Sequence, residues 1–521
     1  MAEAIFSALL GDVVSRAISL LIGHYTSGKE STEGKLQRIS HLLIRIHSVV
    51  EEAKGRQISN HGTLRWLSEL IDGEYQGCYL LDSIGYGGQE EAVELCDGDK
   101  VVPPQVSTLS LFNPAKRVRV DGGTKRRSNK FSWHHDVGAD EIDRVLERLQ
   151  GMSHDLREFI MLLQNCKPIR RPLATSIFRE GQMFGRHVEK ERIINFLLHE
   201  GEQSAAGELG VLPIVGASGV GKTTLVQHAC DDYRVRNHFA VIILCNSLCT
   251  YDVKNNQRTL TRTLIDPLEF VKGNSFRDKK CLFVFDENVD MHRKHILEEL
   301  LQILRGCCKE ESKVIITSNN RNVANIIGTV EPIILRVLRH AEYWFFFKAH
   351  AFPGRDTEDN PSLISAAMGI ARKLNGSFFG AKIIGGVLRD RPDPNLWCKI
   401  LRSSIGGMGP MGDCIIYISD LAHNLLPGHV DMRTVTCSKD PFPSQTAEVP
   451  WLKDLCGAVP HDSLTACWAD EGRYTNVLLC KSVMPFRSNR YYVARCTCTC
   501  SSTIGPTNSC SELVLSIVRD M

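Results

Sequence analysis

Apolar residues in the first third of the chain recur at alternating steps of three and four. Four such series occur, at residues 6–20, 36–50, 64–81 and 142–163. This spacing places the apolar side chains on one face of a helix, and a helix with such a face needs partners to bury it. We therefore predict an antiparallel four-helix bundle over residues 1–165.

Residues 85–138 interrupt this bundle and are rich in Gly, Pro, Ser and charged residues. That composition predicts a long, poorly ordered loop. Two basic runs inside it, Lys116-Arg117 and Lys125-Arg126-Arg127, are either a split nuclear-import signal or ordinary charges of a solvated loop.

A polar linker over residues 166–182 precedes a different pattern. Short, continuous apolar runs follow at residues 211–215, 241–245, 281–285, 314–317 and 333–335. Helical stretches lie between most of these runs, which is typical of a parallel sheet covered by helices on both faces. We predict this α/β domain over residues 183–340 and a small helical subdomain over residues 341–405. The fold class is therefore multidomain, α followed by α/β.

The pattern degrades in residues 406–521, where Gly, Pro, Ser and Cys interrupt the apolar runs. Residues 477–480 and 491–494 are candidate strands, and residues 511–519 are a candidate short helix. A segment that buries little apolar area cannot offset its conformational entropy, so we predict poor order for this region. No repeat of fixed period is visible in it.

The chain has 521 residues, 43% hydrophobic and 23% charged, a balance typical of soluble globular proteins. Its net charge of +2 argues against a general nucleic-acid or membrane-surface binder, and we expect no specific nucleic-acid partner. The N-terminus lacks a basic n-region, and no clean apolar run of about 18 residues occurs, so we expect neither a signal peptide nor a transmembrane segment. We expect a cytoplasmic protein with free thiols, also nuclear if the basic runs act as an import signal.

The strongest chemical signal lies between the first apolar run of the α/β domain and the helix that follows it. Residues 216–223 read Gly-Ala-Ser-Gly-Val-Gly-Lys-Thr, which fits the P-loop pattern in the strand-to-helix context that it requires. Its glycines let backbone N–H groups surround phosphates, its lysine reaches the β- and γ-phosphates, and its threonine hydroxyl ligates Mg²⁺. The candidate nucleotide-binding residues are Gly216, Gly219, Gly221, Lys222, Thr223 and Thr224, and Thr223 is also a candidate metal ligand.

An acidic residue at the end of a neighbouring strand completes such a site, and the apolar run 281–285 ends in Asp286 and Glu287. Asp286 would hold Mg²⁺ through water, and Glu287 would polarise an attacking water, so both are candidate catalytic residues. The Cys496-Thr-Cys498-Thr-Cys500 run is a weaker metal candidate, because zinc sites usually combine two separated pairs of ligands.

Several further motifs follow one another in an order that resembles a known family. They are Met183–Arg186, Val235–Phe239, Ser312–Thr317, Tyr343–Phe352 and Gly376–Lys382. From Phe184 to about Ile400, the chain resembles the NB-ARC domain of plant intracellular immune receptors of the coiled-coil NLR class. The bundle resembles the coiled-coil domain of these receptors, especially in Trp66, Leu67 and Tyr79–Asp82.

The resemblance implies roles for residues outside the P-loop. Phe184, Gly185 and Arg186 would lie near the adenine, and Phe378 takes the place of a proline that packs against the base. Asn319 stands where the family has an arginine that reads the γ-phosphate.

Other departures concern whole motifs. The bundle has Cys78 and Tyr79 where the family has acidic residues, and it keeps Asp82. No Met-His-Asp motif and no leucine-rich repeats appear. The chain therefore resembles a shortened or diverged member.

The resemblance implies an immune receptor-like protein of plant defence that binds ADP or ATP with Mg²⁺ and acts as a switch or helper, with slow hydrolysis at most. It also implies self-association and contacts of the bundle with other immune receptors or host proteins. Two alternatives stay open: a P-loop NTPase with genuine ATP hydrolysis, and a non-switching decoy or interaction protein that acts through its helical bundle.

Overall fold

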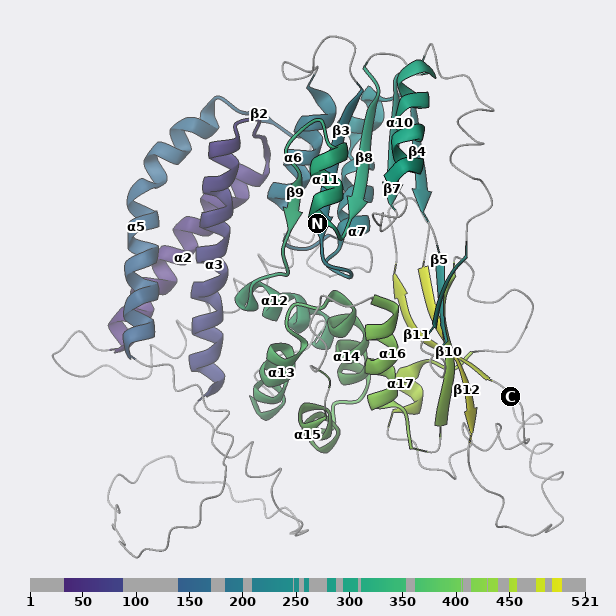
Figure 1. The fold of residues 1–521 in the computed structure, drawn as a ribbon. Coiled ribbons are helices and arrows are strands. Elements are labelled where there is room, and N and C mark those ends of the chain that lie inside the picture. Colours follow the sequence, from purple (N-terminus) through teal and green to yellow (C-terminus); the bar gives the residue numbers. More distant parts are fainter. Residues whose placement is uncertain are drawn as a thin grey trace, which may run out of the picture.

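A computed structural model gives the fold drawn in Figure 1. The described residues are 32–87, 139–169, 183–199, 209–246, 248–252, 257–261, 279–286, 294–307, 311–352, 361–403, 405, 414–428, 430–438, 449–456, 475–482 and 490–498. The predicted helix at residues 6–20, most of the predicted loop and the candidate helix at 511–519 lie outside them. Within the described ranges, no helix is both long and apolar enough to cross a bilayer.

Three helices of the predicted bundle are described: α2 (Thr32–Lys54), α3 (His61–Gly87) and α5 (Ala139–Gln164). Their apolar stripes meet in one core that contains fully buried leucines from all three helices. α2 and α5 run in the same direction, because Lys35 pairs with Asp143 near their starts and Arg56 donates to the Cys166 carbonyl oxygen at their ends. The short strands β1 (Arg56–Gln57) and β2 (Lys167–Pro168) follow the C-terminal ends of α2 and α5 and pair antiparallel there.

The five apolar runs of the predicted α/β domain form one parallel sheet, as the sequence predicted. Its strands are β3 (Gly210–Gly216), β4 (Val241–Asn246), β7 (Cys281–Asp286), β8 (Lys313–Ser318) and β9 (Ile333–Leu335). They lie in the order β4-β7-β8-β3-β9, with every pair parallel. The strand that leads into the P-loop is therefore separated from β7 by β8 alone.

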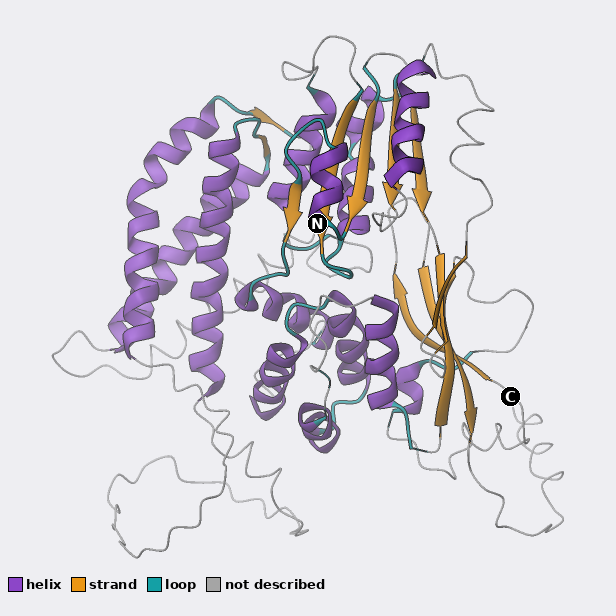
Figure 2. Ribbon diagram, in the orientation of Figure 1, coloured by secondary structure: helices purple, strands orange, loops and turns teal. Residues whose placement is uncertain are grey.

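Helices cover both faces of this sheet (Figure 2). They are α6 (His187–Leu198), α7 (Lys222–Cys230), α8 (Tyr233–His238), α10 (Lys294–Cys307) and α11 (Arg321–Ile327). Along β7, Leu282 and Val284 face the α6–α8 side, whereas Phe283 and Phe285 face the α10–α11 side. Both sides of the strand are buried, which explains why its sequence is continuously apolar.

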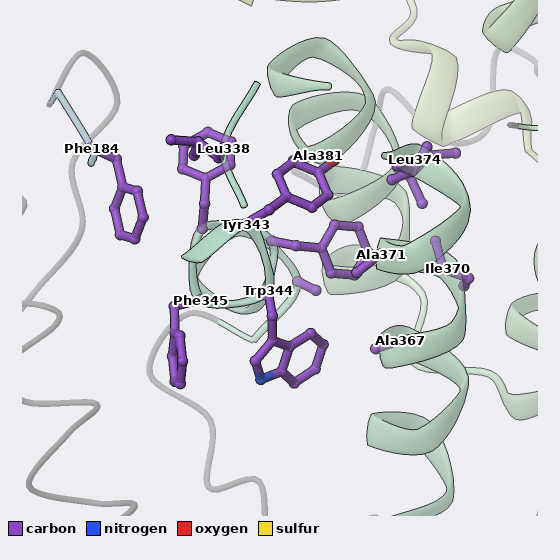
Figure 3. Close-up of a cluster of buried hydrophobic side chains, with 14 of the residues drawn as sticks. Phe184, Leu338, Tyr343, Trp344, Phe345, Ala367, Ile370, Ala371, Leu374 and Ala381 are labelled. Carbon is purple, nitrogen blue, oxygen red and sulfur yellow. The ribbon is translucent and has the colours of Figure 1, made fainter. Parts of the chain in front are cut away.

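A helical subdomain follows the sheet. It contains α12 (His340–Ala351), α13 (Pro361–Leu374), α14 (Phe378–Asp390) and α15 (Pro394–Arg402). α12 is buried over most of its surface, and its aromatic residues Tyr343, Trp344 and Phe345 are fully buried. Figure 3 shows Phe184 on one side of α12 and α13 on the other. Such a helix is stable only when neighbours surround it.

The described part of residues 406–521 has more regular structure than the sequence predicted. It contains α16 (Cys414–Leu425), β10 (Val430–Ser438), α17 (Leu452–Leu455), β11 (Thr475–Ser482) and β12 (Arg490–Cys498). The candidate strands at 477–480 and 491–494 fall within β11 and β12. The expectation of poor order does not hold for these segments, because their short apolar runs are buried against one another and against α14 and α16.

These strands join two strands from the middle of the chain, β5 (Leu248–Asp252) and β6 (Gln257–Thr261), which the sequence did not predict. The antiparallel sheet has the order β11-β12-β10-β5-β6 (Figure 2). β10 is its junction, because Thr434–Thr436 pair with Thr250–Asp252 on one side and with β12 on the other. The C-terminal region is thus hydrogen-bonded to a hairpin that belongs to the α/β domain by sequence.

A buried polar cluster joins the bundle to the helical subdomain. Asp82 of α3 accepts hydrogen bonds from Trp344 Nε1 and from Lys348 Nζ of α12, each at 2.9 Å. Asp82 is 3% exposed and Lys348 is 1% exposed, so the ion pair is shielded from water. Tyr75 of α3 also packs its ring against Phe345 of α12. The bundle and the subdomain therefore share one core.

Replacing Lys348 by methionine should destabilise the protein by about 3–5 kcal/mol, because Asp82 would stay buried without its charged partner. The double variant Asp82→Asn/Lys348→Met should recover most of this loss, since a neutral amide still accepts from Trp344. Chemical denaturation measures both. Lys453→Met, which removes a surface pair with Asp390, is the control and should cost about 0–1 kcal/mol. A Lys348→Met loss no larger than that of the control would contradict a stabilising role for the buried pair.

Candidate nucleotide-binding site

The P-loop connects β3 to α7 in a conformation that needs glycine. Gly219 and Gly221 have φ angles of 76° and 92°, in the left-handed region that other residues rarely adopt. A Cβ atom on Gly216 would lie 2.6 Å from the Leu335 carbonyl oxygen, so no side chain fits there. Two glycines of the motif thus allow the left-handed backbone, and the third allows close packing against Leu335. A loop that surrounds a phosphate requires such a backbone.

Lys222 is the first residue of α7 and is 7% exposed. Its Nζ donates to the carbonyl oxygens of Gly216 at 2.7 Å and Ala217 at 2.8 Å, and to Asn319 Oδ1 at 2.6 Å. The ammonium therefore lies across the mouth of the loop, against the end of β8. A cation in this position is suited to meet a phosphate that the loop surrounds.

Thr223 and Thr224 follow Lys222 in the first turn of α7, and both are half-buried. Gly221 precedes the helix and supplies no side-chain cap. The first N–H groups of a helix have no intrahelical partners, and the helix dipole is positive at this end. The start of α7 therefore adds backbone donors to the same loop and favours an anion.

Asp286 ends β7 at the edge of the sheet where the P-loop begins. β7 and β3 both pair with β8, with Phe285 opposite Ile316 and Val215 opposite Ser318. In a parallel sheet all carboxyl ends meet at one edge, so Asp286 lies at the edge that carries Lys222. Glu287, the other predicted acidic residue, lies outside the described residues.

Phe378 is brought to the P-loop from the helical subdomain. It begins α14, whose N-cap Ser377 accepts a hydrogen bond from the Gly380 N–H. Its ring lies 3.5 Å from the position that a Cβ on Gly221 would occupy, and it packs edge-on against Phe346 of α12 at 4.8 Å between centroids. An aromatic ring thus borders the loop where the resemblance expects a group facing the base.

Phe184 is buried between the bundle and α12. It is 4% exposed, and its ring packs against Tyr75 of the bundle at 6.0 Å and Phe346 at 5.4 Å. Its side chain therefore belongs to the core between α3 and α12. The expected position of this segment near an adenine stays a prediction.

Gly185 and Arg186 lie between the sheet and α12. Gly185 has a φ of 66°, and a Cβ atom there would collide with the Glu342 carboxylate. Arg186 donates to Glu189 at 3.1 Å and to the Arg336 carbonyl oxygen. Arg186 thus ties the start of α6 to the segment that leads into α12.

Glu342 of α12 has a buried carboxyl group with a shifted pKa. Burial raises the pKa of its carboxyl to about 8. Arg186 and Arg339 oppose this increase, whereas Glu189 and Asp72 add to it. The group is therefore largely protonated at neutral pH, which removes a negative charge from the junction between bundle, sheet and subdomain.

A buried ion-pair network that the sequence did not reveal fixes α8 to α6. Arg234 donates to both carboxylate oxygens of Glu191, at 2.7 and 3.0 Å, and to Asp232 at 2.9 Å. α7 contacts both helices, so the network holds the surroundings of the P-loop helix. Glu191 lies 43 positions from Arg234 in the sequence, and no local pattern signals that pair.

The cysteines give no support to a metal site. No cluster of His, Cys, Asp and Glu suited to a metal occurs among the described residues. Burial raises the pKa of Cys496 on β12 to about 12, so its thiol is protonated at neutral pH. The expectation of free thiols holds for buried cysteines such as Cys78 and Cys230, but not for Cys398, which is disulfide-bonded.

Glu342→Gln should change how the stability of the protein depends on pH. The unfolded carboxyl ionises near its ordinary pKa of 4.5, whereas the folded one keeps its proton up to about 8. Between these values the unfolded state loses a proton that the folded state retains, so the wild type loses stability as pH rises. The melting temperature of Glu342→Gln should therefore rise relative to wild type across this window. Below pH 4.5 the difference should be constant, and a constant difference throughout would refute the assignment.

Comparison with known proteins agrees with this geometry. The NB-ARC domain pattern matches residues 186–357, which include the sheet, the P-loop and α12. A Solanum bulbocastanum protein named RGA1 is 27% identical over 471 residues, 86% of this chain and 42% of RGA1. RGA2, a disease resistance protein of the same species, is 26% identical over 445 residues, 82% of this chain and 41% of RGA2. RPP13-like protein 1 of Arabidopsis thaliana is 26% identical over 450 residues, 84% of this chain and 41% of that protein.

The chain thus spans about two fifths of the length of these relatives. The matches extend beyond the P-loop into the bundle and the helical subdomain, because each covers more than four fifths of this chain. A shared P-loop alone would not produce matches of that extent. This chain therefore contains an NB-ARC domain and is homologous to plant disease resistance proteins.

Proposed function

We propose that this protein binds ADP or ATP at the P-loop. The observation that carries the proposal is Lys222, which is nearly buried and lies against a loop shaped by Gly216, Gly219 and Gly221. A buried ammonium beside left-handed glycines and a helix N-terminus is a binding site for a phosphate chain. The NB-ARC domain is a nucleotide-binding module, and this similarity supports the proposal.

The residues fit a nucleoside diphosphate or triphosphate with Mg²⁺. Lys222 and the backbone N–H groups of the loop would hold the β-phosphate, and the Phe378 ring borders the loop on the subdomain side. Thr223 and Asp286 would hold Mg²⁺, whose chemistry when bound is to neutralise charge on the phosphate oxygens. Glu287 is proposed as the residue that would activate water if the bound nucleotide is hydrolysed.

We propose further that the protein acts in plant defence as an immune receptor-like switch or helper. The support is the homology to RGA2, which is named a disease resistance protein. The proposal extends to contacts of the bundle with other receptors or host proteins, to self-association and to a cytoplasmic or nuclear location. Because the bundle shares its core with the subdomain through Asp82 and Lys348, a change near the nucleotide can reach the bundle through α12.

Lys222→Ala should reduce nucleotide retention by at least about a hundredfold, since the variant loses a charge-assisted bond to the β-phosphate inside a partly dehydrated loop. The measurement is the ADP and ATP released on denaturing the purified protein, combined with titration of Mg-ADP. Arg236→Ala is the control. This residue lies on nearby α8 and forms an exposed ion pair with Asp231. Retention of ADP by Lys222→Ala at the level of this control would show that the nucleotide site lies elsewhere.

A further inference from the structure

We propose that Asn319 is the exchangeable acceptor of Lys222 and that it lowers the affinity of the site for ADP and ATP by the same factor. The inference rests on the proposed nucleotide binding and adds a residue that tunes it. Asn319 acts here as a positioning residue, since it works through Lys222.

Lys222 already donates hydrogen bonds within the protein. An ammonium group has three protons, and the structure shows three acceptors within 2.8 Å of Nζ. Two of them are carbonyl oxygens of the P-loop backbone, Gly216 and Ala217. The third and shortest contact is the side-chain oxygen of Asn319. A phosphate oxygen that accepts from Lys222 therefore competes with these acceptors.

Strand order explains why Asn319 reaches Lys222. β8 is the direct neighbour of β3, and Ser318 lies opposite Val215 in the parallel register. The residue that follows Ser318 is thus level with Gly216, at the start of the P-loop. The contact spans 97 positions of sequence, which places it beyond any local sequence pattern.

The surroundings of Asn319 make it the acceptor that can leave. Ser318 Oγ accepts from the Asn320 N–H at 3.0 Å, and Asn320 Oδ1 accepts from the Asn322 N–H at 2.9 Å. These bonds hold the backbone between β8 and α11 and leave the Asn319 side chain to rotate. Asn319 is solvent-exposed, so water can take over its amide. The two P-loop carbonyls cannot withdraw without reshaping the loop.

When a phosphate displaces Asn319, Lys222 loses its hydrogen bond to the amide oxygen and gains one to a phosphate oxygen. The cost is the same whether the phosphate belongs to ADP or to ATP, because the atom released is the same. The amide is neutral, so it adds no charge that would favour the triphosphate. Asn319 should therefore weaken both nucleotides together and leave their ratio unchanged.

The test is calorimetric titration of the full chain with Mg-ADP and with a non-hydrolysable Mg-ATP analogue. Asn319→Ala should bind both roughly tenfold more tightly than wild type, the size expected for one charge-assisted hydrogen bond. Asn319→Asp should bind both more weakly, because its carboxylate pairs with Lys222 and repels phosphate. The ratio of the two affinities should stay within about twofold of wild type in Asn319→Ala.

Asn320→Ala is the matched control. It removes the bond that supports the first turn of α11 and leaves the Asn319–Lys222 contact in place. Its affinities should equal those of wild type, even if its melting temperature falls. A purely structural role for Asn319 would instead weaken binding in both of its variants and could not tighten it.

Two results would overturn the proposal and differ from each other. If wild type binds both nucleotides and Asn319→Ala binds them equally or more weakly, Asn319 does not compete for Lys222, while the proposed function stands. If neither wild type nor any variant binds a nucleotide, the proposed function fails and this inference fails with it.

Discussion

The structure depends on the enclosure of α12. This helix is buried over most of its surface, so it is stable only when neighbouring elements cover it. The bundle, Phe184, α13 and α14 supply that cover, and each is held in place by doing so. The position of Phe378 beside the P-loop follows, because its ring rests on Phe346 of α12. The nucleotide site and the bundle are thus two neighbours of one buried helix.

Two buried lysines show how the same side chain serves different ends. Lys348 is paired with the carboxylate of Asp82, so its charge is compensated within the protein. Lys222 donates to neutral oxygens, two from the backbone and one from Asn319. A compensated buried charge is structural, and its loss exposes its partner to a large desolvation cost. Lys222 instead lies beside the glycines of the P-loop and the N-terminus of α7, which favour a bound anion.

The sequence predicted those features that depend on neighbouring residues. The strands of the parallel sheet were recognisable because both of their faces are buried, and the P-loop because its glycines have a fixed spacing. β5 and β6 were not, because they are short, polar and stabilised by β10 far along the chain. The position of Phe184 near the base stays a prediction, whereas the packing of its ring against Phe346 of α12 depends on long-range contacts that the sequence does not show. The Asn319–Lys222 contact follows from strand order, which no local pattern encodes.

The antiparallel sheet has a consequence for how this chain is made. β5 pairs with β10 through Thr250–Asp252 and Thr434–Thr436. β5 and β6 therefore leave the ribosome long before their partner strand is synthesised. Until then the hairpin presents an unpaired edge, which is a template for pairing with other chains. Pairing across such a separation is slow, because the intervening chain must first be closed into a loop. The nascent chain therefore passes through a stage in which the hairpin edge is open to pairing with other chains. Pairing with β10 ends that stage.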